Sequence, residues 1–241
     1  MRPCRTRELS LAHRRAPFPE TLLAAAIRHG SVGRMTKLYF APSACSLSPH
    51  IALREAGLEF ELVRVDFMRD KRTSDGGRLT DVNPKGYLPV LALDDGRLLT
   101  EGAAIVQFIA DQRPASGLAP PPGTFERVRL QEWLNFIATE IHKGLSPLYA
   151  PKANEEYREV VRSKVAGRLG FLAGGLAKTP YLLGDTFTVA DGYAFYVMRS
   201  WRRLTRTDLP PDLQPYYARI ASRPAVKAAL RAEGLAEPAG T

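Results

Sequence analysis

Cys45 is the side chain of this sequence that is best placed to do chemistry. It follows a predicted strand and a Pro42–Ala44 turn, and stands at the first turn of a predicted helix. Unpaired backbone N–H groups and the helix dipole stabilise a thiolate there, and in comparable sites they lower the thiol pKa to roughly 3.5–7.5. Ser48 completes Cys-Ser-Leu-Ser, which resembles a monothiol redox site whose natural partner is an external thiol. An inert, buried cysteine is the alternative interpretation.

Two further segments carry groups that could hold a ligand. Asn83–Pro89 is a loop that enters a strand at Leu88-Pro89, where a cis bond would leave the Leu88 backbone free to pair with an extended peptide. Glu101-Gly102 begins a helix, so its free N–H groups suit a carboxylate while the Glu101 carboxylate suits an ammonium. An ordinary acidic first turn explains the second segment equally well.

A polar stripe runs along the predicted long helix of the second half. Asn135, Thr139 and His142 recur at spacings of four and three, beside the apolar stripe of the same helix. This spacing predicts that His142 faces a cleft, although a structural histidine has the same pattern. His50, beside Pro49 on the first helix, is interpreted as structural.

The elements that must position these groups divide into two halves. The first half predicts a four-stranded sheet with packed helices, the α/β thioredoxin-like arrangement. Its strands and helices are expected at residues 37–41, 46–56, 61–66, 89–93, 97–99 and 101–111. The Asp94-Asp95-Gly96 sequence predicts the hairpin between the last two strands.

Beyond a proline-rich linker within residues 112–123, every pattern is helical. Apolar residues at spacings of three and four mark a long core-facing helix: Leu130, Leu134, Ile137, Ile141 and Leu145. Tyr157–Leu176 predicts another helix, Thr188–Asp191 a capping box, and Tyr216–Leu230 a helix interrupted at Arg223-Pro224. The second half is therefore an all-α helical bundle.

Composition excludes several classes of function. Of the net charge of +9, residues 1–34 supply +5, from seven Arg against two Glu, so the remainder has no basic stripe for nucleic acid. Two cysteines and four unclustered histidines predict neither a disulfide scaffold nor a metal site. No run reaches the ~18 apolar residues of a membrane span, so we expect a cytoplasmic protein in a reducing compartment. Residues 1–34 are interpreted as a disordered tail or an over-long start.

Five segments in order resemble the bacterial beta class of cytosolic glutathione transferases, from Met35 to Leu235. They are KLYFAPSACSLSPHIALREAG, NPKGYLPVL, LLTEGAAI, EWLNFIATEIHKG and FTVADGYAF. The resemblance implies a thioredoxin-like domain over 35–115, a linker over 116–123, a helical domain over 124–241, and a homodimer. Glutathione would be a substrate, with a hydrophobic electrophile, no metal, no nucleic acid and no membrane.

The resemblance also assigns site residues. Cys45 and His142 correspond to the family's catalytic positions. Those that would bind glutathione are Lys71, Leu88, Pro89, Glu101, Gly102, Asn135, Thr139, Glu140 and Ile141. Gly102 departs from other classes, which place Ser there. The electrophile pocket is expected to include Phe40, Tyr149, Met198 and Trp201.

Three functions remain open. The enzyme could transfer the glutathione sulfur to electrophiles. It could instead exchange thiols through a mixed disulfide at Cys45, reducing disulfides or peroxides. The chain could also be a non-catalytic binding module for a protein or hydrophobic ligand, a reading that the joint presence of Cys45, Glu101 and His142 disfavours.

Overall fold

The computed structural model describes residues 36–150 and 153–235. The expectation for residues 1–34 therefore lies outside the described residues, as do the ends of the predicted domains at residues 35 and 241. None of the described helices is long and apolar enough to cross a membrane.

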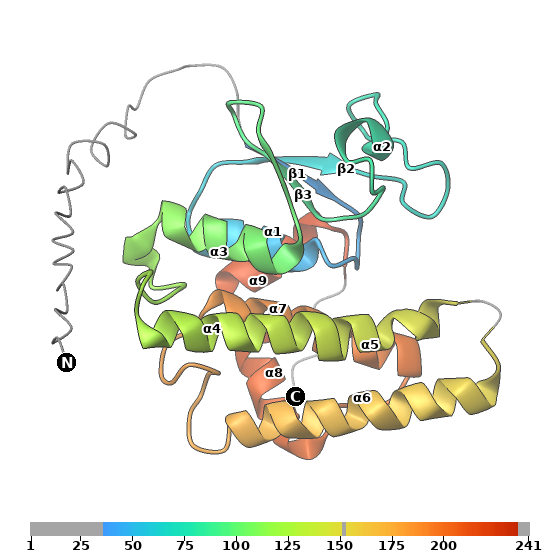
Figure 1. Cartoon of the computed structure of the whole chain (residues 1–241), viewed down its shortest axis with the longest axis vertical. Coiled ribbons are helices and arrows are strands. Elements are labelled where there is room, and N and C mark those ends of the chain that lie inside the picture. Colours follow the sequence, from blue (N-terminus) through green and yellow to red (C-terminus); the bar gives the residue numbers. More distant parts are fainter. Residues whose placement is uncertain (1–35, 151–152, 236–241) are drawn as a thin grey trace, which may run out of the picture. The chain divides into compact units, whose positions relative to one another are not determined.

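The first half forms a mixed four-stranded sheet of order β2-β1-β3-β4 (Figure 1). Strand β1 (Lys37–Phe40) pairs in parallel with β2 (Glu61–Arg64) and antiparallel with β3 (Val90–Ala92), which pairs antiparallel with β4 (Leu98–Thr100). Helix α1 (Leu47–Glu55) makes the crossover between the parallel strands, and α3 (Gly102–Gln112) follows β4. The predicted thioredoxin-like arrangement is confirmed. The short helix α2 (Leu79–Val82) was not predicted, since it is a single turn.

The second half is helical, as predicted. Its elements are α4 (Phe125–Phe136), the π-helix η3 (Ile137–His142), α5 (Lys143–Leu145), the 3₁₀-helix η4 (Ser146–Tyr149), α6 (Glu155–Gly175), α7 (Val189–Thr205), η5 (Pro211–Leu213), α8 (Gln214–Ala221) and α9 (Pro224–Ala232). The five apolar residues of the predicted long helix are all at most 1% exposed. The Thr188–Asp191 capping box at the start of α7 is confirmed, as is the break before Pro224.

Helix α1 is the centre of the packing. Every residue from Leu47 to Leu53 is buried, because α3, α7 and α9 all pack against it (Figure 1). An amphipathic helix normally buries one stripe, whereas a helix buried all round must be covered on every side. Helices from both halves of the chain therefore cover α1, and they pack with it in one hydrophobic core.

His50 brings a polar group into this core and is fully buried there. Arg54 Nε donates to His50 Nε2 at 2.8 Å, so the ring proton lies on Nδ1, which donates to Glu233 Oε1 at 2.9 Å. The other Glu233 carboxylate oxygen has no hydrogen-bond partner among the described residues. This interaction ties α1 to the end of α9 and agrees with the structural interpretation of His50.

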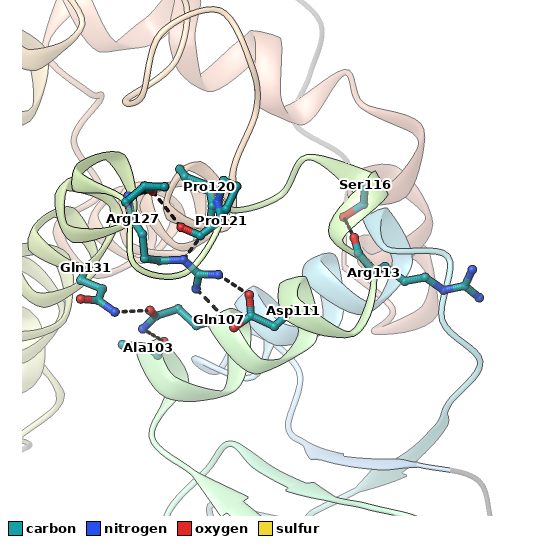
Figure 2. Close-up of polar contacts among 10 residues, drawn as sticks. Ala103, Gln107, Asp111, Arg113, Ser116, Pro120, Pro121, Arg127 and Gln131 are labelled. Carbon is teal, nitrogen blue, oxygen red and sulfur yellow. Dashed lines mark hydrogen bonds and ion pairs between the residues drawn. The ribbon is translucent and has the colours of Figure 1, made fainter. Parts of the chain in front are cut away.

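Helices α3 and α4 run antiparallel and are joined by polar side chains (Figure 2). Arg127 forms an ion pair with Asp111, Gln131 Nε2 donates to Gln107 Oε1 at 3.2 Å, and Gln107 Nε2 donates to Ala103 O at 2.9 Å. From the Arg127 contact to the Gln131 contact, the position rises by four residues on α4 and falls by four residues on α3, as expected for antiparallel helices.

The proline-rich segment between α3 and α4 is more ordered than a simple linker. It contains a 3₁₀-helix, η2 (Pro114–Ser116), and the buried Leu118, whose carbonyl accepts from Val189 N at 3.0 Å. Arg127 Nε donates to Pro120 O at 2.8 Å (Figure 2). Sequence periodicity missed this order because it rests on contacts with α4 and α7.

We predict that Glu233→Ala lowers the free energy of unfolding by about 1–3 kcal/mol, because it leaves the buried His50 Nδ1–H without an acceptor. Urea unfolding of the full chain measures this loss. The matched control is Glu132→Ala, which removes an exposed carboxylate that pairs with Arg129 and should cost less than about 0.5 kcal/mol. Equal losses for the two variants would contradict the role of Glu233.

Candidate active site

The turn between β1 and α1 holds Cys45 in a defined position. Ser43 has a φ of +62°, and the buried Ser46 hydroxyl bonds both the N–H and the carbonyl of Ala41, at 3.2 and 3.3 Å. Cys45 is a free, partly buried thiol whose Sγ–H donates to Leu88 O at 3.2 Å. The Leu88-Pro89 bond that precedes β3 is cis. The strand-helix turn and the proline loop therefore meet at the thiol.

The pKa of Cys45 contradicts the sequence-based expectation. Burial raises this pKa to about 12, although the backbone N–H groups of Cys45 and Ser46 act in the opposite direction and the Glu101 charge raises it slightly further. The backbone N–H groups thus lower the Cys45 pKa as predicted, but desolvation of the thiolate raises this pKa by more. At neutral pH Cys45 is a protonated thiol and a hydrogen-bond donor. Ser48, the other half of the Cys-Ser-Leu-Ser motif, is buried and its hydroxyl has no partner within the described residues.

His142 lies at the end of η3 between two tyrosines of α7. Its Nδ1 is 2.9 Å from the Tyr193 hydroxyl and its Nε2 is 3.3 Å from the Tyr196 hydroxyl. Burial, followed by the charge of Lys143, lowers the His142 pKa to about 4, so the imidazole is neutral at pH 7. A neutral imidazole has one N–H and one lone pair. One tyrosine hydroxyl must therefore donate to the ring nitrogen that has the lone pair, while the other accepts from the ring N–H. The accepting hydroxyl can donate its own proton to another acceptor.

Tyr193 connects this histidine to the rest of the site. A Cβ placed on Gly102 would lie 3.7 Å from the Tyr193 hydroxyl and 3.8 Å from Pro89 Cγ. Burial raises the Tyr193 pKa, and so do the negative charge that Cys45 would carry if it ionised and the charge of Glu101. The phenol therefore stays protonated, close to the thiol, the cis-proline and the start of α3.

Glu101 and Gly102 form the start of α3 as predicted. Glu101 has a φ of +69°, a conformation that non-glycine residues avoid and that is concentrated at functional sites. Its exposed carboxylate accepts from Lys85 Nζ at 2.8 Å. The first N–H groups of an α-helix have no acceptor within the helix, so those of Gly102 and Ala103 can take an anion. At Gly102 a serine Cβ would make only ordinary contacts, so the departure from Ser is not imposed by space.

Lys71 lies on the loop after β2, with a φ of +57°. Its Nζ donates to Gly86 O at 3.0 Å and lies 5.3 Å from the centre of the Phe67 ring. The contact with Gly86 brings Lys71 to the Asn83–Pro89 loop, two residues from Leu88.

The remaining predicted residues lie on α4 and η3. The contacts Asp111 to Arg127 and Gln107 to Gln131 set an antiparallel register between α3 and α4 (Figure 2). Continued by one turn, this register pairs position 103 with position 135. This register places the exposed Asn135 beside the start of α3. Thr139, also exposed, donates from Oγ1 to Asn135 O at 2.9 Å.

Glu140 and Ile141 point elsewhere. Glu140 Oε2 accepts from Arg168 Nε on α6 at 3.0 Å. The Ile141 side chain is fully buried in the core and leaves only its backbone for a ligand. Of the side chains expected around the electrophile, Phe40, Met198 and Trp201 belong to the core, while Tyr149 is 46% exposed.

Models of the two domains of one protein family match the two halves of the chain that contribute to this site. The model described as "Glutathione S-transferase, N-terminal domain" matches residues 42–112, and the corresponding C-terminal domain model matches residues 136–224. Glutathione S-transferase GstA of Escherichia coli O157:H7 is 45% identical over 201 residues, which cover 83% of this chain and 99% of that protein. The chain belongs to the glutathione S-transferase family.

Solved structures place this transferase near bacterial members of the family. The ternary complex of BphK, a bacterial glutathione S-transferase, is 55% identical, has a TM-score of 0.79, and is matched over 83% of this chain and 100% of that one. A beta-class glutathione S-transferase of Sphingomonas chungbukensis is 42% identical with a TM-score of 0.77, over the same shares of the two chains. The predicted resemblance to the beta class is confirmed, and the chain is an enzyme of the transferase class.

Tyr193 and Tyr196 are the site residues of this transferase that sequence reasoning missed. Both are nearly buried, at 4% and 3% exposure, within the long apolar run of α7. Their spacing of three places both hydroxyls on one face, opposite His142. A pair of tyrosines within the mainly apolar residues 189–198 of α7 was the available signal. Within the described residues, no group of three or more His, Cys, Asp or Glu is placed to hold a metal ion.

We predict that this transferase loses stability between about pH 6.5 and 4 because of His142. The unfolded histidine binds a proton near pH 6.5, whereas the folded one stays neutral until about pH 4, so protonation favours the unfolded chain in this window. The contribution lost from pH 7 to 5 is on the order of 2 kcal/mol.

Urea unfolding at pH 7 and pH 5 measures this loss. His142→Gln should remove that part of the pH dependence, while Lys164→Gln, on the exposed side of α6, should retain it. An unchanged pH dependence in His142→Gln would show that the imidazole titrates normally.

Proposed function

We propose that this transferase binds reduced glutathione along the Asn83–Pro89 loop and the start of α3. The loop offers the Leu88 backbone to the peptide, next to the Cys45 thiol. The γ-glutamyl end carries a carboxylate and an ammonium, which suit the free N–H groups at Gly102 and the Glu101 carboxylate respectively. In this arrangement glutathione would displace Lys85 from Glu101.

The other predicted residues fit the same pose. Lys71, whose Nζ donates to Gly86 O on the same loop, supplies a cation for the glycine carboxylate. Asn135 and Thr139 approach the start of α3 from the helical half, and Ile141 contributes its backbone alone. Glu140 would act through its ion pair with Arg168 and not by direct contact.

The reaction is transfer of the glutathione sulfur to an electrophilic carbon. A bond forms between sulfur and carbon, the leaving group departs with its electron pair, and the thiol proton passes to solvent. The enzyme accelerates this step if it stabilises the thiolate, since the thiolate is the nucleophile. The electrophile is expected to be hydrophobic and to approach past Tyr149.

The observation that carries this proposal is the meeting of Cys45, Tyr193 and His142 beside the cis-proline loop. Cys45 and Tyr193 have raised pKa values and therefore carry protons at neutral pH. The hydrogen bonds at His142 use the proton of only one tyrosine. If that tyrosine is Tyr196, the Tyr193 hydroxyl next to Gly102 keeps its proton for the bound thiolate. Neutral donors in a buried site can stabilise a bound thiolate without adding a competing negative charge.

Thiol exchange through Cys45 receives less support. It needs the Cys45 thiolate, and burial raises the Cys45 pKa to about 12, so the protonated thiol predominates at pH 7. The chain also retains a complete set of polar groups for the peptide, which a pure binding module would not need. We therefore place conjugation ahead of both alternatives.

We predict that Tyr193→Phe and His142→Ala each lower kcat for conjugation of glutathione to an activated aryl chloride by ~10²-fold, because each removes a donor or its support. Cys45→Ala should cost less than about tenfold, as expected for one neutral hydrogen bond. Steady-state kinetics with saturating glutathione measure these effects.

Tyr157→Phe, at an exposed position on α6, is the matched control and should leave kcat unchanged. Full activity in Tyr193→Phe would refute the donor role. Complete loss of conjugation in Cys45→Ala, together with a mixed disulfide between glutathione and wild-type Cys45 by mass spectrometry, would establish exchange instead.

The enzyme is also proposed to be a homodimer. Helices α4 and α6 expose several large apolar side chains, and the largest exposures are those of Phe125 at 71%, Phe171 at 62% and Val160 at 61%. The Phe171 ring also contacts Trp133 and Phe136, so apolar rings of α4 and α6 lie together at this part of the surface. Exposed apolar patches of this kind mark interaction surfaces.

We predict a species of twice the 26.6 kDa chain mass in sedimentation at micromolar concentration. Phe171→Lys should shift this species toward the monomer by placing a charge in the interface, while Arg97→Gln, on the β3–β4 hairpin, should not. An active wild-type monomer would contradict the proposal.

A further inference from the structure

A cavity of about 380 Å³ lies at the end of α7, and arginines form most of its lining. Arg199, Arg202, Arg203 and Arg206 follow one another at helical spacing and all reach it. Its other lining residues are Thr207, Asp208 and the α8 residue Tyr217. Four arginines against one aspartate give the lining a formal charge of +3. The volume falls within the range of small-molecule sites.

Ordinary helix electrostatics explain only part of this cluster. Cations are favourable in the last turn of a helix, which accounts for Arg202 and Arg203. It does not account for the convergence of two more arginines on the same cavity, where like charges repel. Arg206 also adopts the left-handed conformation, with a φ of +58°, at a position after the helix where glycine is the usual residue.

The contacts of Arg202 and Arg203 compensate little of the positive charge of these two side chains. Arg202 Nη2 donates to Asp208 at 3.3 Å, and its guanidinium lies 5.5 Å from the centre of the Tyr217 ring. Arg203 Nη2 donates to the Tyr149 hydroxyl at 2.9 Å and its guanidinium lies 5.5 Å from the centre of that ring, so its partner is neutral. Guanidinium groups bind carboxylate and phosphate oxygens in pairs, and a concave cluster of them selects a compact anion with several charges.

Arg203 also connects this cavity to the active site. Its partner Tyr149 is among the groups that raise the pKa of Tyr196, after burial and the negative charge that an ionised Cys45 would carry. The Tyr196 hydroxyl in turn contacts His142 Nε2 at 3.3 Å. An anion that draws Arg203 away from Tyr149 would therefore change the surroundings of the tyrosine that holds His142.

We propose that the end of α7 is a binding site for a small, multiply charged oxyanion of the size of a diphosphate, and that Arg203 couples its occupancy to the active site. The binding site stands on the geometry of the cavity alone. The coupling rests on the proposed role of His142 in conjugation.

Inorganic pyrophosphate is the probe for binding, titrated calorimetrically into the full chain at fixed ionic strength. We expect one site per chain with a dissociation constant below about 1 mM, and weaker binding of sulfate. Arg206→Gln and Arg203→Gln should each weaken binding about tenfold or more, since each removes charge-assisted hydrogen bonds. The control Arg97→Gln removes an exposed arginine that pairs with Asp95 and should leave binding unchanged.

Equal loss in Arg97→Gln, or no preference for pyrophosphate over sulfate, would show a diffuse basic surface and overturn the site. Thermal melting establishes that the variants, which alter exposed side chains, remain folded.

The coupling is tested by conjugation kinetics with and without pyrophosphate. Saturating pyrophosphate should change kcat/KM of the wild type at least about twofold, and this response should vanish in Arg206→Gln and Arg203→Gln. Basal activity of Arg206→Gln should be unchanged. Binding without any change in rate would overturn the coupling while the site remains. Since calorimetry needs no activity, a failure of the proposed function would not be confused with a failure of the binding site.

Discussion

The burial of α1 is the constraint on which the rest of this structure depends. A helix covered on every side cannot be completed by its own sheet, so α3, α7 and α9 must pack against it. This packing carries the residues of α7 to the first turn of α1 and hence to Cys45. The two halves therefore share one hydrophobic core, and the site forms where they meet. The position of the thiol is a consequence of packing over the whole chain.

The same burial decides what kind of chemistry the site can perform. Desolvation is the largest cause of the shifted pKa values of Cys45, His142 and Tyr193, and in each case it favours the neutral form. A site made of neutral donors stabilises charge that arrives with the substrate instead of holding charge of its own. In the proposed binding mode Glu101 and Lys71 supply charge at the edges of this site, where a peptide with charged ends would need it.

Local pattern was sufficient for the sheet, the main helices and the positions of Cys45, Leu88 and Glu101 at a turn, a loop and a helix start, whereas their grouping into one site came from the family resemblance. Local pattern failed where a property of a residue depends on contacts with residues that are distant in sequence. The direction of the Cys45 pKa shift was wrong because helix-terminus effects can be read locally and burial cannot. The π-helix Ile137–His142 was not predicted, although its Ile141 is buried in the core as the apolar spacing predicted. Tyr193 was missed because its partner lies 51 residues away.

The contact between His50 and Glu233 has a consequence for how the chain reaches its fold. These residues are separated by 183 positions, and their hydrogen bond lies against the most buried helix of the first half. During synthesis, the sheet and α1 emerge long before α9 exists to cover them. Contacts of such long range form late and slowly. The nascent first half therefore carries an uncovered apolar helix for most of translation, the stage at which a chaperone would have most to shield.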